Sequence, residues 1–354
     1  MIAERLAAQL LSGPPASDPV AVAERLLAIQ GQDQRGARLA VRARTEGLTA
    51  ADVDRALTTD RTLVITWVNR GTLHLVRSED YPWLHALTTP PLFSPSARRL
   101  AQEGVTPDAA ERGVAVIERA LAEEGPLVRA ELRDRLAAAG VRIEGQALVH
   151  VLLLATLHGL VVRGPVVGSE QAFVLVRDWL GAAATAPVDR DAALTELARR
   201  YLAGHGPADD RDLARWTGLP LRDARAGLTG IASELEQRAD GLVDLAGRAR
   251  APELPPPRLL GAFDPLLLGW TSRLSIVGPE GAGIVTTNGI FRPFALVDGR
   301  AVATWRMVRR EVELEPFGRL GQDDRAALEA DAVEVKAFLG GAGEEEHGKM
   351  RRDD

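Results

Sequence analysis

The 354-residue sequence predicts a mainly α-helical protein with added β-structure, of the α+β class, divided into several small domains. Three observations support this prediction. Within the first 90 residues, helical segments are followed by two β-rich segments. A motif centred on Gly-Pro then occurs twice, at residues 121–126 (LAEEGP) and 202–207 (LAGHGP). Finally, a proline-rich joint precedes a series of short apolar segments separated by tight-turn sequences.

The composition excludes several classes of protein. Hydrophobic residues make up 46% of the chain and charged residues 26%, as in globular proteins. No apolar run reaches 18 residues, and the N-terminus lacks a basic region followed by an apolar core. We therefore expect no transmembrane helix, no signal peptide and a cytoplasmic protein of bacterial type. Cysteine is absent and the six histidines lack metal-binding spacing, so we expect no disulfide, no metal and no cofactor.

The first predicted domain covers residues 1–90. Asp18-Pro19 is a typical start for the helix predicted at residues 21–29. Thr49 and Asp52 have capping-box spacing and open a second helix. Residues 62–68 and 71–76 are β-rich and separated by a turn sequence. Helices followed by a hairpin indicate a winged helix, and we interpret residues 91–107 as a linker.

The Gly-Pro repeat predicts two further winged helices, at residues 108–182 and 190–250. In each copy a helix ends at Gly, Pro restarts the chain, and a short amphipathic helix follows. The first copy continues with an apolar helix at residues 145–159 and two strands that form a wing hairpin. The second copy offers one candidate strand, at residues 242–245.

The last predicted domain covers residues 255–340 and is rich in β-structure. Asn288-Gly289 and Asp298-Gly299 are suited to tight hairpin turns. We expect an antiparallel sheet closed by an acidic helix at residues 322–338, and a disordered tail at residues 341–354. The expected strands are residues 275–277, 283–287, 294–297, 301–307 and 312–314.

Two amides lie close together at the end of the first helical run, at Gln30 and Gln32. Residues i and i+2 share a face on a strand but point in opposite directions on a helix, and Gly31 disfavours a helix. We therefore expect both amides to project the same way from a short extended segment. Such a pair can hold one water or one polar group, because each amide has a carbonyl acceptor and two N–H donors. In most proteins, however, such glutamines are simply solvated or cap a helix.

The net charge of −6 does not identify a partner, because the charge is distributed unevenly. Acidic residues concentrate on the predicted C-terminal helix and in the tail, whereas several arginines directly follow the glutamine pair. These arginines form either a local basic face or an ordinary solvated surface. A basic face could contact DNA phosphates.

Four segments, taken together and in order, resemble the AlkZ-like tandem winged-helix DNA glycosylases. They are residues 28–33 (AIQGQD), 67–75 (WVNRGTLHL), 262–269 (AFDPLLLG) and 292–300 (RPFALVDGR). The resemblance covers nearly the whole chain. It implies a C-shaped monomer that embraces double-stranded DNA carrying alkylated purines, and that is nucleoid-associated when bound. The reaction it implies is excision of bulky or crosslinked alkylated purines.

In this family the catalytic motif is a glutamine, an aliphatic residue, and a glutamine or aspartate. Here the motif falls on Gln30 and Gln32, with Gly31 at the aliphatic position. An amide is a very weak base, but it can orient a water and direct its carbonyl dipole at developing positive charge. A purine alkylated at N7 is cationic and leaves readily, so two amides suit it. Because the only lysines are Lys336 and Lys349, the first domain has no lysine to form a Schiff base, and we expect a monofunctional glycosylase.

Further residues are assigned less specific functions. Asp33 is the nearest stronger base, although an extended segment would direct it to the opposite face. His74 shares a strand face with Thr72 and either contacts a phosphate or polarises the base, or is a packed or solvated histidine of the wing. Asp264 precedes Pro265 and is interpreted as a turn or cap residue. The expected DNA-binding residues are Arg35, Arg38, Arg42, Arg70, Arg292 and Arg300.

The alternative is a non-enzymatic winged-helix DNA-binding or transcription-regulatory protein. Such a protein would present basic second helices to the major groove. The helix predicted at residues 145–159 contains no arginine or lysine, which disfavours this function for the first repeat.

Overall fold

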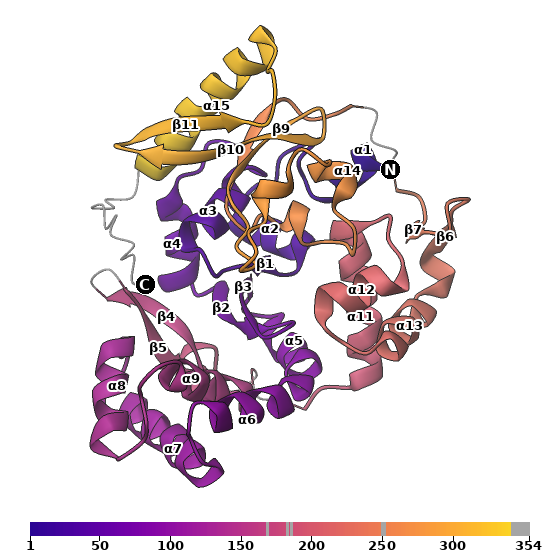
Figure 1. Cartoon of the computed structure of the whole chain (residues 1–354). Coiled ribbons are helices and arrows are strands. Elements are labelled where there is room, and N and C mark those ends of the chain that lie inside the picture. Colours follow the sequence, from indigo (N-terminus) through magenta and orange to yellow (C-terminus); the bar gives the residue numbers. More distant parts are fainter. Residues whose placement is uncertain (168–169, 182–183, 185–186, 249–252, 341–354) are drawn as a thin grey trace.

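A computed structural model describes the chain except for residues 168–169, 182–183, 185–186, 249–252 and 341–354 (Figure 1). The tail that we expected to be disordered therefore lies outside the described residues. The described chain combines helices with antiparallel sheets, as the sequence predicts. Within it, no helix is both long and apolar enough to cross a membrane.

The N-terminal part contains five helices and three strands. Asp18 caps α2 through the Ala21 N–H, at 2.9 Å, and Thr49 and Asp52 form the predicted capping box of α4. Strand β3 lies between β1 and β2, antiparallel to both. The elements are α1 (Ile2–Ala8), α2 (Pro19–Leu26), β1 (Ile29–Gln30), α3 (Gln34–Arg42), α4 (Ala50–Thr58), β2 (Leu63–Val68), β3 (Thr72–Arg77) and α5 (Tyr81–Thr88).

The second part packs closely against the first. Most of residues 91–107, which we expected to be a linker, form helix α6 (Phe93–Gln102), in which Ser96 and Leu100 are buried. Strand β2 also pairs with β4 at Ile65 and Arg163, so one five-stranded sheet, β1-β3-β2-β4-β5, joins the two parts. The other elements are η1 (Pro90–Leu92), α7 (Pro107–Glu124), α8 (Arg129–Ala138), α9 (Ala147–Leu157), β4 (Val161–Val167), β5 (Glu170–Leu175) and α10 (Val176–Trp179).

The third part repeats the helical pattern of the second. Helices α7 and α11 both end directly before a Gly-Pro pair, as predicted. The candidate strand at residues 242–245 pairs with β6, which the sequence analysis missed. The elements are α11 (Arg190–His205), α12 (Asp210–Thr217), α13 (Leu221–Gly230), η3 (Ala232–Glu234), β6 (Leu235–Gln237) and β7 (Val243–Leu245).

The C-terminal part is a four-stranded antiparallel sheet in the order β11-β10-β9-β8, with α15 beside it. Two predicted strands are wrong: residues 275–277 lie in a helix and residues 283–287 form no strand. The Asp298-Gly299 hairpin turn is confirmed, with φ of 49° and 74°. The elements are β8 (Arg258–Leu260), η4 (Pro265–Leu267), α14 (Leu274–Val277), η5 (Ala282–Ile284), β9 (Phe294–Val297), β10 (Arg300–Val308), β11 (Glu311–Pro316) and α15 (Gln322–Gly340).

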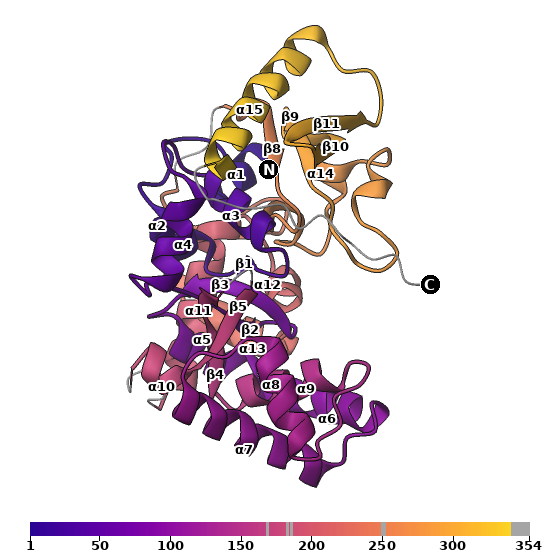
Figure 2. The ribbon, with the colours of Figure 1, turned by 90° about the vertical axis from the view of Figure 1, so that its left-hand side faces the viewer.

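The parts are arranged around strands β1–β3. Figure 2 shows α6–α9 at one end of the molecule, α15 with β9–β11 at the other, and β1–β3 between them. One face of β2 and β3 buries Val64, Val68 and Val76 in a core shared with α5 and α11. The other face buries Ile65 and Leu75 against α2, α3 and α4. The side chain of any residue on these strands therefore faces one of two different environments.

Candidate active site

A tight turn at Leu27 ends α2 and starts the extended segment. Leu27 has φ 64° and ψ −48°, and the Ala28 N–H donates to the Leu26 carbonyl at 2.8 Å. This is a γ-turn with positive φ, a rare and strained conformation for a residue with a side chain. The Leu27 side chain is fully buried, and its packing offsets the strain. The helix predicted at residues 21–29 therefore ends early, and Ile29 and Gln30 become a strand.

Pairing with β3 fixes the direction of the two glutamine side chains. Gln30 lies opposite His74, and the Gly31 N–H donates to the Leu73 carbonyl at 2.7 Å. Gly31 does not adopt a left-handed conformation. A Cβ at Gly31 would lie 3.4 Å from the Leu75 nitrogen and 3.5 Å from the Ile65 side chain. This position faces Ile65 and Leu75, whereas Gln30 faces the other side of the sheet with His74.

The two amides meet, as the i, i+2 spacing predicts. The Gln30 Nε2 donates to the Gln32 Oε1 at 2.5 Å. Gln30 is only 6% exposed, whereas Gln32 is exposed. Gln30 retains its carbonyl oxygen and one N–H for a further partner, and Gln32 retains both N–H groups. The pair therefore offers donors and an acceptor at the boundary between the interior and solvent.

His74 is a neutral neighbour of the amide pair. It lies opposite both Gln30 and Thr66 in the sheet and is 2% exposed. Its Nδ1 is 2.9 Å from the Thr72 carbonyl, which can only accept, so Nδ1 carries the proton and Nε2 is an acceptor. Burial, with a smaller effect of the Arg70 charge, lowers the His74 pKa to about 3. His74 is therefore neutral at pH 7.

Asp33 serves as the N-cap of α3 in the structure. Its carboxylate accepts a hydrogen bond from the Gly36 N–H, which positions it at the helix start. Gly36 in turn packs against the carbonyl of Ala262, so close that a Cβ would collide with it. The helix that follows the glutamines is thereby fixed to the segment after β8.

Two of the three arginines expected to follow the DNA backbone are engaged in ion pairs. Arg38 binds Asp54 at 2.8 Å. Arg42 binds both carboxylate oxygens of Asp331, at 2.7 and 2.8 Å, and is mostly buried. Arg42 thereby joins α3 to α15. Arg35 is exposed on the first turn of α3.

Arg44 and Asp264 form a fully buried ion pair between the first and last parts of the chain. Both N···O distances are 2.9 Å, and neither side chain is exposed. The remaining Arg44 donors bind the Ala40 and Gln9 carbonyls and the Gln9 side chain. Asp264 also accepts the Leu266 N–H and so caps η4, which confirms the predicted cap.

The other three expected DNA-binding arginines differ in environment. Arg70 donates to the Trp216 carbonyl at the end of α12, and burial lowers its pKa to about 10. Arg292 is exposed. Arg300 is also exposed, and it follows a turn whose Gly299 packs near Ile2 and Leu6 of α1.

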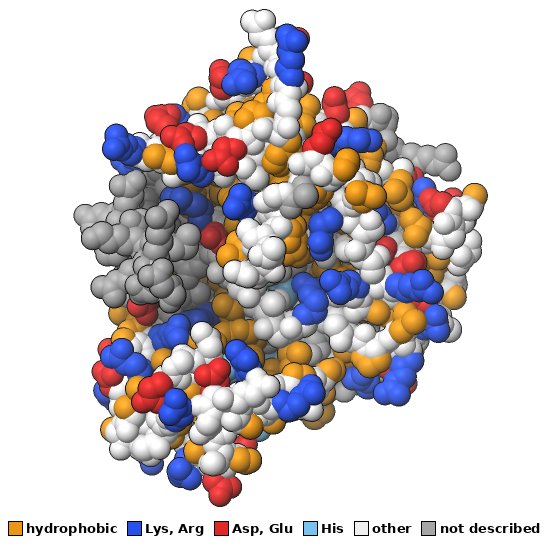
Figure 3. Space-filling model, viewed as in Figure 1, with side chains coloured by type: hydrophobic (Ala, Val, Ile, Leu, Met, Phe, Trp, Pro, Cys, Tyr) orange, Lys and Arg blue, Asp and Glu red, His pale blue; other side chains and the backbone are white. Residues whose placement is uncertain are grey.

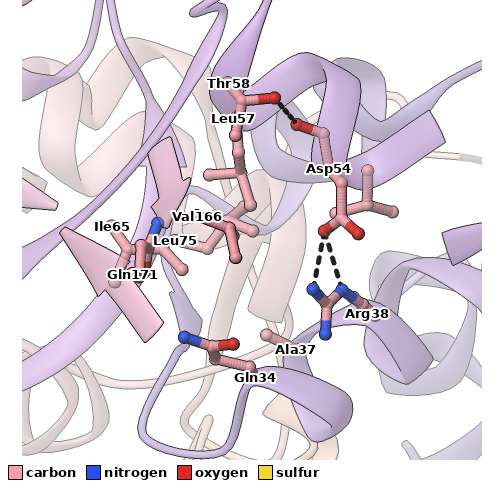
Figure 4. Close-up of a pocket in the computed structure, with 11 residues that line it drawn as sticks. Gln34, Ala37, Arg38, Asp54, Leu57, Thr58, Ile65, Leu75, Val166 and Gln171 are labelled. Atoms are coloured by element: carbon pink, nitrogen blue, oxygen red, sulfur yellow. Dashed lines mark hydrogen bonds and ion pairs between the residues drawn. The ribbon is translucent and has the colours of Figure 1, made fainter. Parts of the chain in front are cut away.

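A hollow lies on the opposite face of the sheet from the amide pair, and its lining is drawn in Figure 4. Ile65 and Leu75 form its floor, and the Arg38–Asp54 ion pair lies beside them. Gln34 lines this hollow, whereas Gln30 and Gln32 do not. The hollow is therefore separate from the candidate active site. The described residues also contain no cluster of His, Asp or Glu that could hold a metal ion.

Comparisons with known proteins identify the class of this protein as a DNA glycosylase. A sequence model of the family described as "DNA glycosylase AlkZ-like" matches residues 23–338, and the chain belongs to this family. It is 29% identical over 350 residues to an interstrand DNA cross-link repair glycosylase of Streptomyces sahachiroi, covering 92% of this chain and 91% of that protein. It is also similar to the structure of the S. sahachiroi DNA glycosylase AlkZ. The TM-score is 0.78, the identity 28%, and the coverage 96% of this chain and 95% of that one.

Proposed function

We propose that this glycosylase hydrolyses the N-glycosidic bond of bulky or crosslinked purines alkylated at N7, using a water held by Gln30 and Gln32. The observation that carries the proposal is the direct contact between the two amides, 2.5 Å from donor to acceptor, at the edge of the buried sheet. The cross-link repair glycosylase of S. sahachiroi, which covers nearly the whole chain, supports crosslinked DNA as the substrate.

In the proposed reaction, the bond between C1′ and the purine nitrogen N9 breaks and its electron pair neutralises the cationic base. The water oxygen bonds to C1′ and releases a proton to solvent. The Gln30 carbonyl accepts a hydrogen bond from the water, which orients it, and stabilises positive charge on the sugar, while an N–H group of Gln32 donates a hydrogen bond to the water's second lone pair. Neutral His74 adds no positive charge that would oppose the oxocarbenium-like transition state.

We further propose that the first 90 residues and the two repeats form three winged helices, which with the C-terminal domain make a C-shaped monomer around duplex DNA. The β4–β5 and β6–β7 hairpins would be the wings of the second and third. Helix α9 buries most of its apolar residues, including Leu148, Val151 and Leu152, in the protein core. This burial disfavours major-groove reading by α9 and hence the regulator alternative.

The first experiment removes each amide in turn. Gln30→Ala should slow single-turnover release of N7-alkylguanine from duplex DNA by roughly 10²–10³-fold, because one preorganised polar group is lost at the reacting centre. Binding to undamaged DNA should be nearly unchanged, because it depends mainly on phosphate contacts. Gln32→Ala should act in the same direction, and the double variant should cost less than the sum. Gln32→Asp should retain activity, since a carboxylate also stabilises cationic charge.

Gln34→Ala is the matched control, because Gln34 is exposed on the next helix but lines the hollow on the other face of the sheet. Its release rate should equal that of the unmodified protein. A wild-type rate for Gln30→Ala would show that the catalytic assignment is wrong.

A further inference from the structure

Three arginines from distant parts of the sequence converge along α12. Arg70, in the β2–β3 turn, donates to the Trp216 carbonyl and lies 3.5 Å from the Arg215 carbonyl. Arg215 itself projects from α12. On the same helix, Asp212 binds the backbone N–H and hydroxyl of Thr271, at 2.8 and 2.5 Å, which holds the segment containing Arg273 against α12. We call Arg70, Arg215 and Arg273 the arginine triad.

No carboxylate neutralises the arginine triad within the described part of the chain. None of the three forms an ion pair there, whereas Arg42, Arg44 and Arg199 each do. Burial and the charge of Arg215 lower the pKa of both Arg70 and Arg273, but both remain protonated at pH 7. Positive charges gathered without a counter-ion carry an uncompensated desolvation and repulsion cost, which an anion would relieve.

Contacts hold two of the guanidinium groups in place. Arg273 donates from Nε to the Leu267 carbonyl at 3.2 Å, and its guanidinium lies 5.1 Å from the centre of the Phe291 ring. Arg70 is held by the α12 carbonyls. These contacts use only some of the five N–H donors of each arginine, so others remain for an anion. Arg215 is exposed and leaves the triad open to solvent. In Figure 3 basic side chains gather near the middle of the face, where Figure 1 places α12.

Arg70 connects the arginine triad to the neighbourhood of the amide pair. Arg70 comes four residues before His74, and its charge acts on the His74 ring. His74 lies opposite Gln30 in the sheet. A phosphate at the triad would therefore be close to the sugar whose bond the amide pair is proposed to hydrolyse.

We propose that Arg70, Arg215 and Arg273 bind one backbone phosphodiester of DNA adjacent to the damaged nucleotide. This inference rests on the proposed function, and it assigns a binding site contributed by three parts of the chain. A fixed phosphate defines the position of the nucleotide, which must leave the base stack before its glycosidic bond can reach the amides.

The test measures binding rather than base release, so that it stays separate from the catalytic proposal. The ligand is a duplex with a tetrahydrofuran abasic analogue, and the variants are Arg215→Ala and Arg273→Ala. Each should bind about tenfold more weakly at 0.1 M salt, because a charged hydrogen-bonding contact is lost. The slope of log K against log salt should fall by about 0.9 for each lost contact. Arg222→Ala is the matched control, since Arg222 lies on α13 with an 86% exposed side chain and should change neither quantity.

A second arm identifies the phosphate. Methylphosphonates, which are neutral, replace single phosphates on either side of the abasic analogue. A methylphosphonate at the contacted position should lower the affinity of the unmodified protein about tenfold. It should not lower the affinity of Arg215→Ala any further, because that variant has already lost the contact. The proposal would be overturned if the salt slope were unchanged in both variants. It would also be overturned if Arg215→Ala lowered the affinity by the same factor at every methylphosphonate position. Because no base is released, an inactive or an active Gln30→Ala leaves this result unaffected.

Discussion

Gly31 lies between the two amides, and the backbone at this position is held by the sheet. Its N–H is bonded to β3, and the place of its missing side chain has ordinary contact distances of 3.4–3.5 Å. We therefore expect Gly31→Ala to raise the free energy of unfolding by about 0.4–1 kcal/mol, because alanine restricts the unfolded chain and suffers no backbone strain here. Urea unfolding measures this change, and the release rate of N7-alkylguanine should be retained.

Gly36→Ala is the matched comparison, because its methyl group would collide with the Ala262 carbonyl. This variant should be less stable than the unmodified protein. If Gly31→Ala instead destabilised the chain, the description of Gly31 as a regular strand residue would be wrong.

Side-chain periodicity predicted the relation between the two glutamines, but not the environment of the arginines. The common direction of the Gln30 and Gln32 side chains depends only on local strand geometry, and so does the shared strand face of His74 and Thr72. Arg42 and Asp331 are 289 residues apart, and no local pattern shows that they pair. The arginine triad was missed for the same reason, except for Arg70. The γ-turn at Leu27 has no sequence signal either, because leucine rarely adopts positive φ.

Among the secondary-structure elements, those with caps or turn dipeptides were predicted best. The Asp18 cap, the Thr49–Asp52 box and the Asp298-Gly299 turn each have a defined chemical cause. Short apolar runs such as residues 275–277 fit a helix or a strand equally, and here the chain forms α14. Strands β6 and β8 have three residues each, too few for a periodic pattern.

Two buried histidines, His74 and His205, should make the stability of the protein depend on pH. Burial lowers the pKa of each to about 3, from 6.5 in the unfolded chain. Below pH 6.5 the unfolded state binds protons that the folded state does not. The stability that the two neutral histidines contribute is therefore fully present above pH 6.5 and is lost progressively as the pH falls toward 3. Each histidine contributes a slope of up to about 1.4 kcal/mol per pH unit within this window.

The measurement is the free energy of unfolding between pH 5 and 7.5. His205→Phe retains an aromatic ring against Tyr201, with which His205 stacks, and should lower the slope by the contribution of one proton. An identical slope in the variant would show that His205 is not the titrating group.

The buried ion pair between Arg44 and Asp264 connects the first and last parts of the chain. Arg44→Met should cost about 3–5 kcal/mol in the free energy of unfolding, because the Asp264 carboxylate would remain buried without its partner. Arg306→Met is the control at an exposed ion pair, with Glu313, and should cost less than about 1 kcal/mol. Urea unfolding distinguishes the two, and equal losses would contradict a special role for the buried pair.

The same ion pair has a consequence for synthesis of the protein on the ribosome. The two residues are 220 positions apart, so at about 5–20 residues per second Asp264 is made roughly 10–40 s after Arg44. During this interval the nascent N-terminal segment contains a core arginine that has no carboxylate partner. We expect this nascent segment to remain incompletely folded, and exposed to proteases, until translation has passed residue 264. Pulse-chase proteolysis of stalled nascent chains ending before and after that residue would measure this delay.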